Sequence, residues 1–297
     1  MIISPSGISP YKIQTFQSGG ASFVGLLDLY PSAAAAYSVR RLSGVYSGSL
    51  MEVRRSSDNA LQDIGFDANG DLDTTSLLSF VGAGDGFIRT WYDQSGNAYD
   101  ATQTTTSAQP QIVSSGVISN KNSKPAIDFS GGNWELDADA AALEFSGTDI
   151  DVNSFSILSA DGGISKFAFA LAASTGTTVN GAVRTNGTDL LRVQFISDAS
   201  VSNIAVTGVN IADQSSVSVI GTPSDFNVYV DSVGVDGNPY TASLGLCSFA
   251  KFAIGNDARP LSLFWEGTIQ ELVFYNTDQS SNRTGIETNQ NDYYTIY

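Results

Sequence analysis

Two short segments combine aromatic rings with carboxyl groups, a combination suited to sugar binding. Residues 91–94 read Trp-Tyr-Asp-Gln, and residues 264–266 read Phe-Trp-Glu. An aromatic ring offers a flat apolar face, and carboxylate and amide groups beside it can hydrogen-bond to hydroxyls. The first candidates for glycan binding are therefore Trp91, Asp93, Trp265 and Glu266.

Both segments also have a structural interpretation. Alternation along a strand puts Trp91 and Asp93 on one face and turns Tyr92 to the other, where it could enter the core. Asp93 is then expected to hold the turn at residues 95–96, and Glu266 to accept hydrogen bonds near the start of a strand.

An acidic loop at residues 67–73 could bind a metal ion. It places oxygen ligands at alternate positions, a spacing that suits calcium, at Asp67, Asn69, Asp71 and Asp73. An EF-hand loop also needs Gly at its sixth position and Glu at its twelfth, but these are Leu72 and Leu78. Asn-Gly and Asp residues are common in turns, so the sequence favours a turn over a calcium site, and it predicts no other cofactor.

The overall composition excludes several function classes. The 297 residues contain no histidine and one cysteine, which rules out a disulfide framework, cysteine-rich zinc modules and Ser-His-Asp or Cys-His catalysis. A net charge of −16 argues against a nucleic-acid partner. No apolar run is long enough for a membrane span, and the first residues lack the pattern of a secretory signal.

Most of the chain predicts β structure. Short segments rich in β-branched and aromatic residues are separated by Gly, Asn, Asp and Ser, which favours an antiparallel sandwich or barrel. The predicted strands are residues 50–55, 87–93, 109–113, 125–131, 154–160, 166–174, 190–197, 217–221, 226–231, 252–256 and 267–276. Helices are predicted within 26–43, over 73–82 and within 277–294, and a hairpin turn near Asp231 and Ser232.

Residues 1–24 are predicted to form an N-terminal arm, and residues 25–297 a single sandwich domain. The arm could pack on its own domain or dock onto a neighbouring subunit. The pairs Arg40-Arg41 and Arg54-Arg55 are expected to form ion pairs with Asp58 or Asp63, although an inter-subunit contact is the alternative.

Three blocks resemble a known family when taken together. They are residues 38–66, residues 70–103, which contain Tyr-Asp-Gln-Ser-Gly-Asn, and residues 254–276. They resemble the catalytic domain of the α-L-arabinofuranosidase B family, a concanavalin A-like jelly roll. The last block also resembles laminin-G-like lectin domains, and similar blocks occur in bacteriophage structural and tail proteins. The resemblance implies an all-β concanavalin A/laminin-G-like sandwich with a few short helices.

The catalytic residues of that family carry over only in part. Asp257, in the string Ile-Gly-Asn-Asp, matches the family's acid/base position and joins the glycan-binding candidates. The family's nucleophile is a glutamate that follows a vicinal cysteine pair, but residues 166–197 contain no glutamate and Cys247 has no partner. A retaining mechanism then lacks its covalent acceptor. An inverting mechanism, which uses a more widely spaced pair of carboxyl groups, is the alternative. The sequence therefore favours a protein that is not an enzyme.

The leading hypothesis is a bacteriophage virion structural protein, in a capsid-decorating or tail-associated position, that displays a glycan-binding, lectin-like domain. Its partners would be other virion proteins, reached through the arm, and cell-surface glycans, in a homo-oligomer or lattice. It would assemble in the host cytoplasm, without nucleic-acid or membrane contacts. The alternatives are an arabinofuranosidase-like glycoside hydrolase and a free bacterial glycan-binding module.

Overall fold

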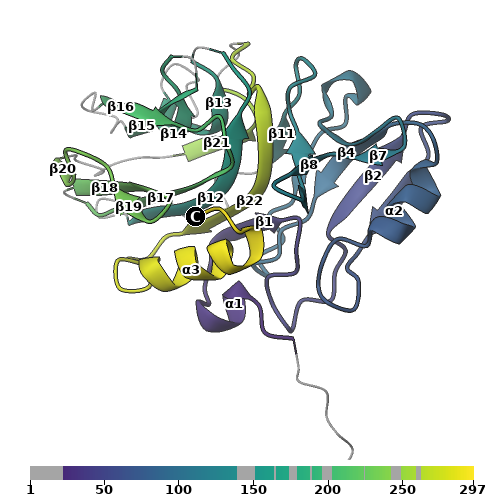
Figure 1. Cartoon of the computed structure of the whole chain (residues 1–297), viewed down its shortest axis with the longest axis horizontal. Helices are drawn as coiled ribbons and strands as arrows, with labels where there is room; N and C mark the ends of the chain where they lie inside the picture. The colour runs from purple at the N-terminus through teal and green to yellow at the C-terminus, as the bar shows by residue number, and fades with distance from the viewer. Residues whose placement is uncertain are drawn as a thin grey trace, which may run out of the picture.

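Two antiparallel β-sheets face each other in this computed structural model (Figure 1). The structure describes residues 23–297 apart from 139–150, 164, 174–178, 188, 196–202, 224, 242–248 and 259–261. Residues 1–22 of the predicted arm thus lie outside the described residues. The predicted all-β, jelly-roll-like fold class is confirmed.

Ten strands of the described residues form the front sheet. In spatial order they are β3 (Leu61–Ile64), β2 (Met51–Arg55), β4 (Gly86–Trp91), β5 (Ala101–Thr102), β11 (Leu136–Ala138), β21 (Phe249–Ile254), β13 (Phe167–Ala173), β14 (Val179–Thr185), β15 (Leu190–Phe195) and β16 (Asn203–Asn210). All of these neighbours pair antiparallel.

The back sheet contains the longest strands. In spatial order they are β1 (Ala35–Ser38), β22 (Gly267–Tyr275), β12 (Val152–Ala160), β17 (Ser215–Gly221) and β18 (Asp225–Val230), with β19 (Val233–Gly234) and β20 (Tyr240–Thr241) both beside β18. The strands β6 (Gln111–Ser114) and β10 (Ile127–Asp128) join the sheets, because β6 pairs with β4 and β10 pairs with both β6 and β22. The short strands β7 (Val117–Ile118), β8 (Asn120–Lys121) and β9 (Lys124–Pro125) complete the connection.

The main core lies between the two sheets. Strand residues alternate between this core and the outer faces, as a period of two requires. On β15, for example, Leu191 and Val193 are buried in the core, while Arg192 and Gln194 lie on the opposite face. A second apolar cluster covers the outer face of the back sheet, where it includes Phe155, Val273 and Tyr275.

The described part of the chain forms three α-helices, which lie outside the sheets. They are α1 (Leu26–Leu29), α2 (Thr74–Val81) and α3 (Arg283–Tyr294), and a 3₁₀ turn, η1, spans Thr106–Ala108. Figure 1 shows α3, in yellow, along the back sheet, where it contacts β12 and β17, and α2 against β2 at the other end of the molecule. No helix among the described residues is long and apolar enough to cross a membrane.

Local signals place α2, the hairpin and α3 where they were predicted. Asp73 caps α2 by accepting the amide of Ser76 at 3.0 Å. The hairpin turns at Asp231 and Ser232, which both have positive φ, between the paired strands β18 and β19. The helix α3 begins at Arg283, later than the predicted caps at residues 277–278, and buries Ile286 as expected.

The helix predicted within residues 26–43 is wrong for most of its length. Only Leu26–Leu29 are helical, and the alanine-rich part forms β1, in which Ala35 pairs with Phe274 and Ala36 with Val273. Ala35 faces the central core and Ala36 the outer cluster of the back sheet, and both are fully buried. The ladder to β22 therefore overrides the high helix propensity of alanine.

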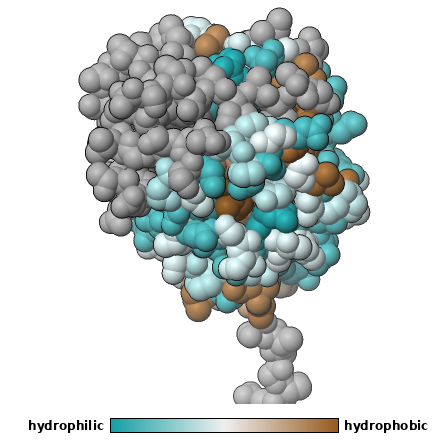
Figure 2. Space-filling view, turned by 90° about the vertical axis from the view of Figure 1, so that its left-hand side faces the viewer, coloured by the Kyte–Doolittle hydropathy of each residue, from teal (hydrophilic) through white to brown (hydrophobic). Residues whose placement is uncertain are grey.

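The described surface is polar where the space-filling view shows it. Figure 2 shows mostly hydrophilic residues on this face, with apolar residues scattered among them. This agrees with the net charge of −16.

Candidate active site

The structure buries two of the predicted glycan-binding residues, Trp91 and Asp93. The Trp91 ring is fully buried, and its Nε1 donates to the carbonyl of Ser38 at 3.1 Å. Asp93 is 3% exposed and accepts the amides of Ala36 and Ser95, at 2.8 and 2.9 Å. This is the turn-holding role that was the structural alternative for Asp93, and neither residue presents a face to solvent.

The second predicted segment lies at the start of β22. Trp265 is fully buried, whereas Glu266 is partly exposed and forms an ion pair with Lys166 at 2.7 Å. Asp257 follows β21 and is 1% exposed. These side chains, together with Trp91 and Asp93, do not form a common open surface.

The acidic loop at residues 67–73 directs its carboxylates to internal donors. Asp67 accepts the amides of Asn69 and Asp71, Asp71 accepts the hydroxyl of Tyr293 at 2.6 Å, and Asp73 caps α2. No group of three metal-ligating side chains is present within the described ranges. Calcium binding by this loop stays a prediction.

The paired arginines form contacts within the chain. Arg55 pairs with Asp58 at 2.7 Å, as expected, on an exposed surface. Arg40 pairs at 2.8 Å with Glu271, a residue 231 positions away in the sequence. The two other arginines bond to backbone carbonyls and amide side chains.

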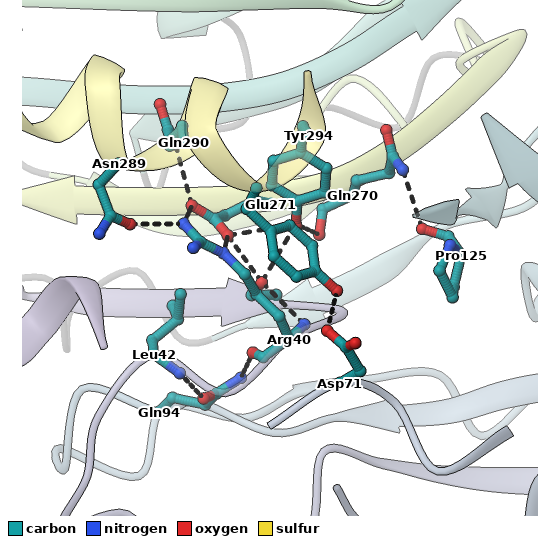
Figure 3. Close-up of polar contacts among 12 residues, drawn as sticks. Arg40, Leu42, Asp71, Gln94, Pro125, Gln270, Glu271, Asn289, Gln290 and Tyr294 are labelled. Atoms are coloured by element: carbon teal, nitrogen blue, oxygen red, sulfur yellow. Dashed lines mark hydrogen bonds and ion pairs between the residues drawn. The ribbon is translucent and has the colours of Figure 1, made fainter. Parts of the chain in front are cut away.

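The Arg40–Glu271 pair is the centre of a buried polar network (Figure 3). Glu271 is fully buried on β22 and also accepts the Ser38 hydroxyl at 2.8 Å and the Gln290 amide at 3.1 Å. The guanidinium of Arg40 lies over the Tyr293 ring, 4.8 Å from its centroid. Burial alone would raise the pKa of Glu271, but the charge and hydrogen bonds of Arg40 hold it below its ordinary value. Gln290 and Tyr294 of α3 both bond to Glu271, so the network attaches α3 to the back sheet.

The outer face of the front sheet carries a different arrangement. One row of cross-strand neighbours runs from β5 to β15 through Thr102, Asp137, Ala253, Ala170, Ala182 and Gln194. Directly paired residues share a face, so polar side chains stand at both ends of this row and three alanines lie between them.

A cavity of about 720 Å³ opens beside the Asp137 end of this row. We call it the β11 cleft; its lining residues are Gln103, Thr105, Ser107, Ala108, Gly132, Asn133, Glu135, Asp137 and Phe264. The cleft thus combines hydroxyl, amide and carboxyl groups with one aromatic ring. This is the chemistry that binds a polyhydroxylated ligand.

Alternation along β11 positions the two carboxyl groups of the cleft. Leu136 and Ala138 are buried in the core, so Glu135 and Asp137 project from the opposite face. The carboxylate of Glu135 accepts the side-chain amide of Asn256 at 2.8 Å, which connects β11 to the segment that carries Asp257.

The two carboxyl groups influence each other electrostatically. Although Asp137 is open to solvent at the cleft, partial desolvation and the nearby Glu135 carboxylate raise its pKa to about 6, against the opposing charge of Lys251. Perturbed carboxyl groups in concave sites are candidates for acid–base chemistry.

Our sequence reasoning missed Glu135 and Asp137 as site residues. The available signal was the string Trp-Glu-Leu-Asp-Ala over residues 134–138, whose polar and apolar residues alternate and so place both carboxyls on one face of a strand. The cavity itself has no local signal, because its walls come from residues 103–108, 132–137 and 264.

One family model matches part of the chain. The family model described as "Alpha-L-arabinofuranosidase B, catalytic" matches residues 28–128, a third of the chain that ends before Glu135. No curated protein sequence matches the chain.

Solved structures show the same fold. An arabinofuranosidase complexed with arabinofuranosyl-α-1,2-xylobiose has a TM-score of 0.64 at 17% identity, and a GH54 α-L-arabinofuranosidase soaked with a cyclic sulfate inhibitor has 0.67 at 16%. In both cases 90% of this chain is covered, but it spans only 64% of the other chain. A Trypanosoma rangeli sialidase in complex with the inhibitor DANA has a TM-score of 0.50 at 14% identity, over 69% of this chain and 32% of that one.

These findings overturn the hypothesis of a phage virion protein with a non-catalytic, lectin-like domain. The family match is to an arabinofuranosidase catalytic domain, the solved arabinofuranosidases share the fold, and nothing in these findings supports a capsid or tail protein. The resemblance to the arabinofuranosidase B catalytic domain is confirmed, while its phage component is unsupported.

Proposed function

We propose that this chain hydrolyses α-L-arabinofuranosides. The observation that carries the proposal is the β11 cleft, which places two carboxyl groups and an aromatic ring on the outer face of an arabinofuranosidase-like fold. The family match over residues 28–128 supports the same substrate class.

Hydrolysis of a glycosidic bond needs a proton donor and a second carboxylate. The β11 cleft offers Glu135 and Asp137 for these two roles. Asp257 occupies the position that resembles the family's acid/base, but it is 1% exposed and does not line the cleft. A general acid must reach the glycosidic oxygen, so accessibility favours the cleft carboxyls over Asp257.

The test is direct hydrolysis by the purified full chain. We expect release of arabinose from 4-nitrophenyl α-L-arabinofuranoside and from arabinan, and no release from the matching aryl β-D-glucopyranoside. A mock preparation from host cells that carry the empty expression vector, purified in the same way, controls for a contaminating host enzyme. Absence of turnover on both arabinosides at every pH from 4 to 8 would refute the proposed function.

A further inference from the structure

Two arginines stand side by side on the outer face of the front sheet. Arg184 on β14 and Arg192 on β15 are directly paired across these neighbouring strands (Figure 1). Both side chains point away from the core, because the adjacent Val183 and Val193 are buried in it. Directly opposite residues have Cβ atoms about 4.5–5.5 Å apart, and like charges at that spacing repel each other. The sheet therefore concentrates positive charge at one place in a chain whose net charge is −16.

Arg192 differs from the ion-paired arginines in its partner. Carboxylates pair with Arg40, Arg55, Arg89 and Arg283. Arg192 instead donates from Nη1 to the neutral side-chain oxygen of Asn186 at 3.1 Å, and no carboxylate among the described residues forms an ion pair with it. This hydrogen bond is exposed, so the tip of the guanidinium is open to solvent. The group thus presents N–H donors and a positive charge to an anion from outside the protein.

An aromatic ring and a hydroxyl position the guanidinium of Arg184. Its Cζ atom lies 4.8 Å from the centroid of the Phe167 ring on β13, and Nη2 donates to the hydroxyl of Ser165 at 3.4 Å. Stacking on a ring restricts the planar group without consuming its N–H donors. Arg184 is therefore held beside Arg192 in a restricted orientation, and both residues are partly exposed.

A row of cross-strand neighbours leads from the β11 cleft to the arginine pair. Phe264, in the wall of the cleft, forms a parallel bridge with Phe167, and Phe167 pairs with Arg184. Three strand spacings separate Phe264 from Arg192, which is about 14 Å across the sheet. A ligand that occupies both places must therefore be a chain of several units rather than one sugar.

We propose that Arg184 and Arg192 bind the carboxylate of a uronic acid unit in the substrate. The fork of a guanidinium matches the two oxygens of a carboxylate, and an anion between two guanidiniums relieves their repulsion. This inference rests on the proposed hydrolase function and names its substrate class. The substrate is an arabinose-containing polysaccharide that also carries acidic sugars, with the arabinofuranosyl group in the β11 cleft and a uronate at the arginine pair.

Two versions of one polymer test this site. An arabinoxylan substituted with glucuronic acid is compared with the same polymer after its carboxyl groups have been reduced to alcohols. Isothermal titration calorimetry of the full chain measures the dissociation constant for each polymer at neutral pH. Because charge-assisted hydrogen bonds are the stronger ones, we expect the wild type to bind the acidic polymer about tenfold more tightly.

Substitutions then assign this preference to the two arginines. Arg192→Gln and Arg184→Gln should each remove most of it, because either change leaves the carboxylate with one guanidinium. Arg192→Lys should retain only part of it, since an ammonium group keeps the charge but lacks the fork. Arg55→Gln removes the same charge from an exposed arginine that pairs with Asp58, so this matched control should keep the full preference.

A sulfated dextran distinguishes a uronate site from general attraction to polyanions. We expect the wild type to bind it more weakly than the acidic arabinoxylan, because the net charge of −16 repels a polyanion that lacks the matching sugar chain. Binding of the sulfated dextran that is equally tight and equally dependent on Arg192 would overturn the uronate assignment. Unfolding midpoints of all variants, measured in parallel, show whether each one retains the fold.

The wild type alone can decide the question, even if a variant fails to fold. Equal affinity for the acidic and the reduced polymer would overturn the inference, and so would a preference that folded Arg184→Gln and Arg192→Gln leave intact. Neither result affects the hydrolase function, which is tested by release of arabinose from the neutral nitrophenyl substrate. Conversely, a wild type that is inactive on that substrate but prefers the acidic polymer would refute the hydrolase and retain the carboxylate site.

Discussion

Replacing Arg40 with methionine isolates the energy of the buried ion pair. The substitution keeps an apolar stem but removes two charge-assisted hydrogen bonds to Glu271, at 2.8 and 3.1 Å. It leaves the Glu271 carboxylate fully buried without its countercharge. Breaking such a pair from one side costs about 3–5 kcal/mol of unfolding free energy at neutral pH.

The pH dependence of that loss is the sharper test. In the wild type the pKa of Glu271 lies below its ordinary value of 4.5, so its contribution is present above that value and disappears as pH falls through the lowered pKa. In Arg40→Met, burial without a countercharge raises the pKa of Glu271. Protonation of this carboxyl at lower pH therefore removes the buried charge and recovers part of the lost unfolding free energy. The difference in stability between the two proteins should therefore grow as pH rises from about 4.5 to 7.

The assay is urea unfolding followed by tryptophan fluorescence at several pH values. Glu271→Gln in the Arg40→Met background should restore much of the stability, because the uncompensated charge is gone. Arg55→Met, which breaks the exposed pair with Asp58, is the matched control and should change stability little at any pH. A loss from Arg40→Met of under ~1 kcal/mol that is the same at pH 4.5 and 7 would refute the reasoning.

Three further substitutions test other parts of the structure. Asp257→Asn should leave kcat/KM on arabino-oligosaccharides within about threefold of the wild type if the cleft carboxyls perform the acid–base steps, and a loss of ~10²-fold or more with an intact fold would assign the proton transfer to Asp257 instead. Asp73→Ala should lower the unfolding free energy by ~0.5–2 kcal/mol by removing the cap to Ser76, and a midpoint unchanged in denaturant titration would contradict that role. Gly267→Ala should destabilise strongly, because its φ is +151° and a Cβ there would lie 2.0 Å from the carbonyl oxygen of Ser159; recovery of folded protein with a wild-type melting temperature would exclude this clash.

The parts of the fold that sequence reasoning predicted are those with local physical signals. A cap and a terminal glycine mark α2, and an Asp-Ser turn marks the hairpin between β18 and β19. Alternating apolar residues mark most strands, including β18, in which Phe226, Val228 and Val230 are buried. Each of these signals is contained within a few neighbouring residues.

The alanine-rich segment shows where such reasoning fails. Its residues favour a helix when considered alone, yet the ladder to β22 and burial on both faces make it a strand. The partner of Arg40 was missed for the same reason, since Glu271 lies 231 residues away. Pairing across the fold, rather than local preference, decides both cases.

The candidate site also has one part that the local sequence predicts and one part that it does not. Alternation within residues 134–138 is enough to place Glu135 and Asp137 on one face, but the cleft also needs residues 103–108 and Phe264. The sequence search instead followed the aromatic–acid segments, where Trp91 and Trp265 serve the core. Large aromatic residues bury well, so their presence beside acids was a weak guide to an open site.

The positions of the two polar centres imply that stability and chemistry can be changed separately. The Arg40–Glu271 network joins α3 to the back sheet, whereas Glu135 and Asp137 lie on the outer face of the front sheet. The apolar core between the sheets separates them. Substitutions at sites that share no partners usually have additive effects. Arg40→Met should therefore lower the unfolding free energy while the pH at which activity falls, as the Asp137 carboxyl loses its proton, stays near 6, and a shift of that pH in Arg40→Met would show that the two sheets are coupled through the core.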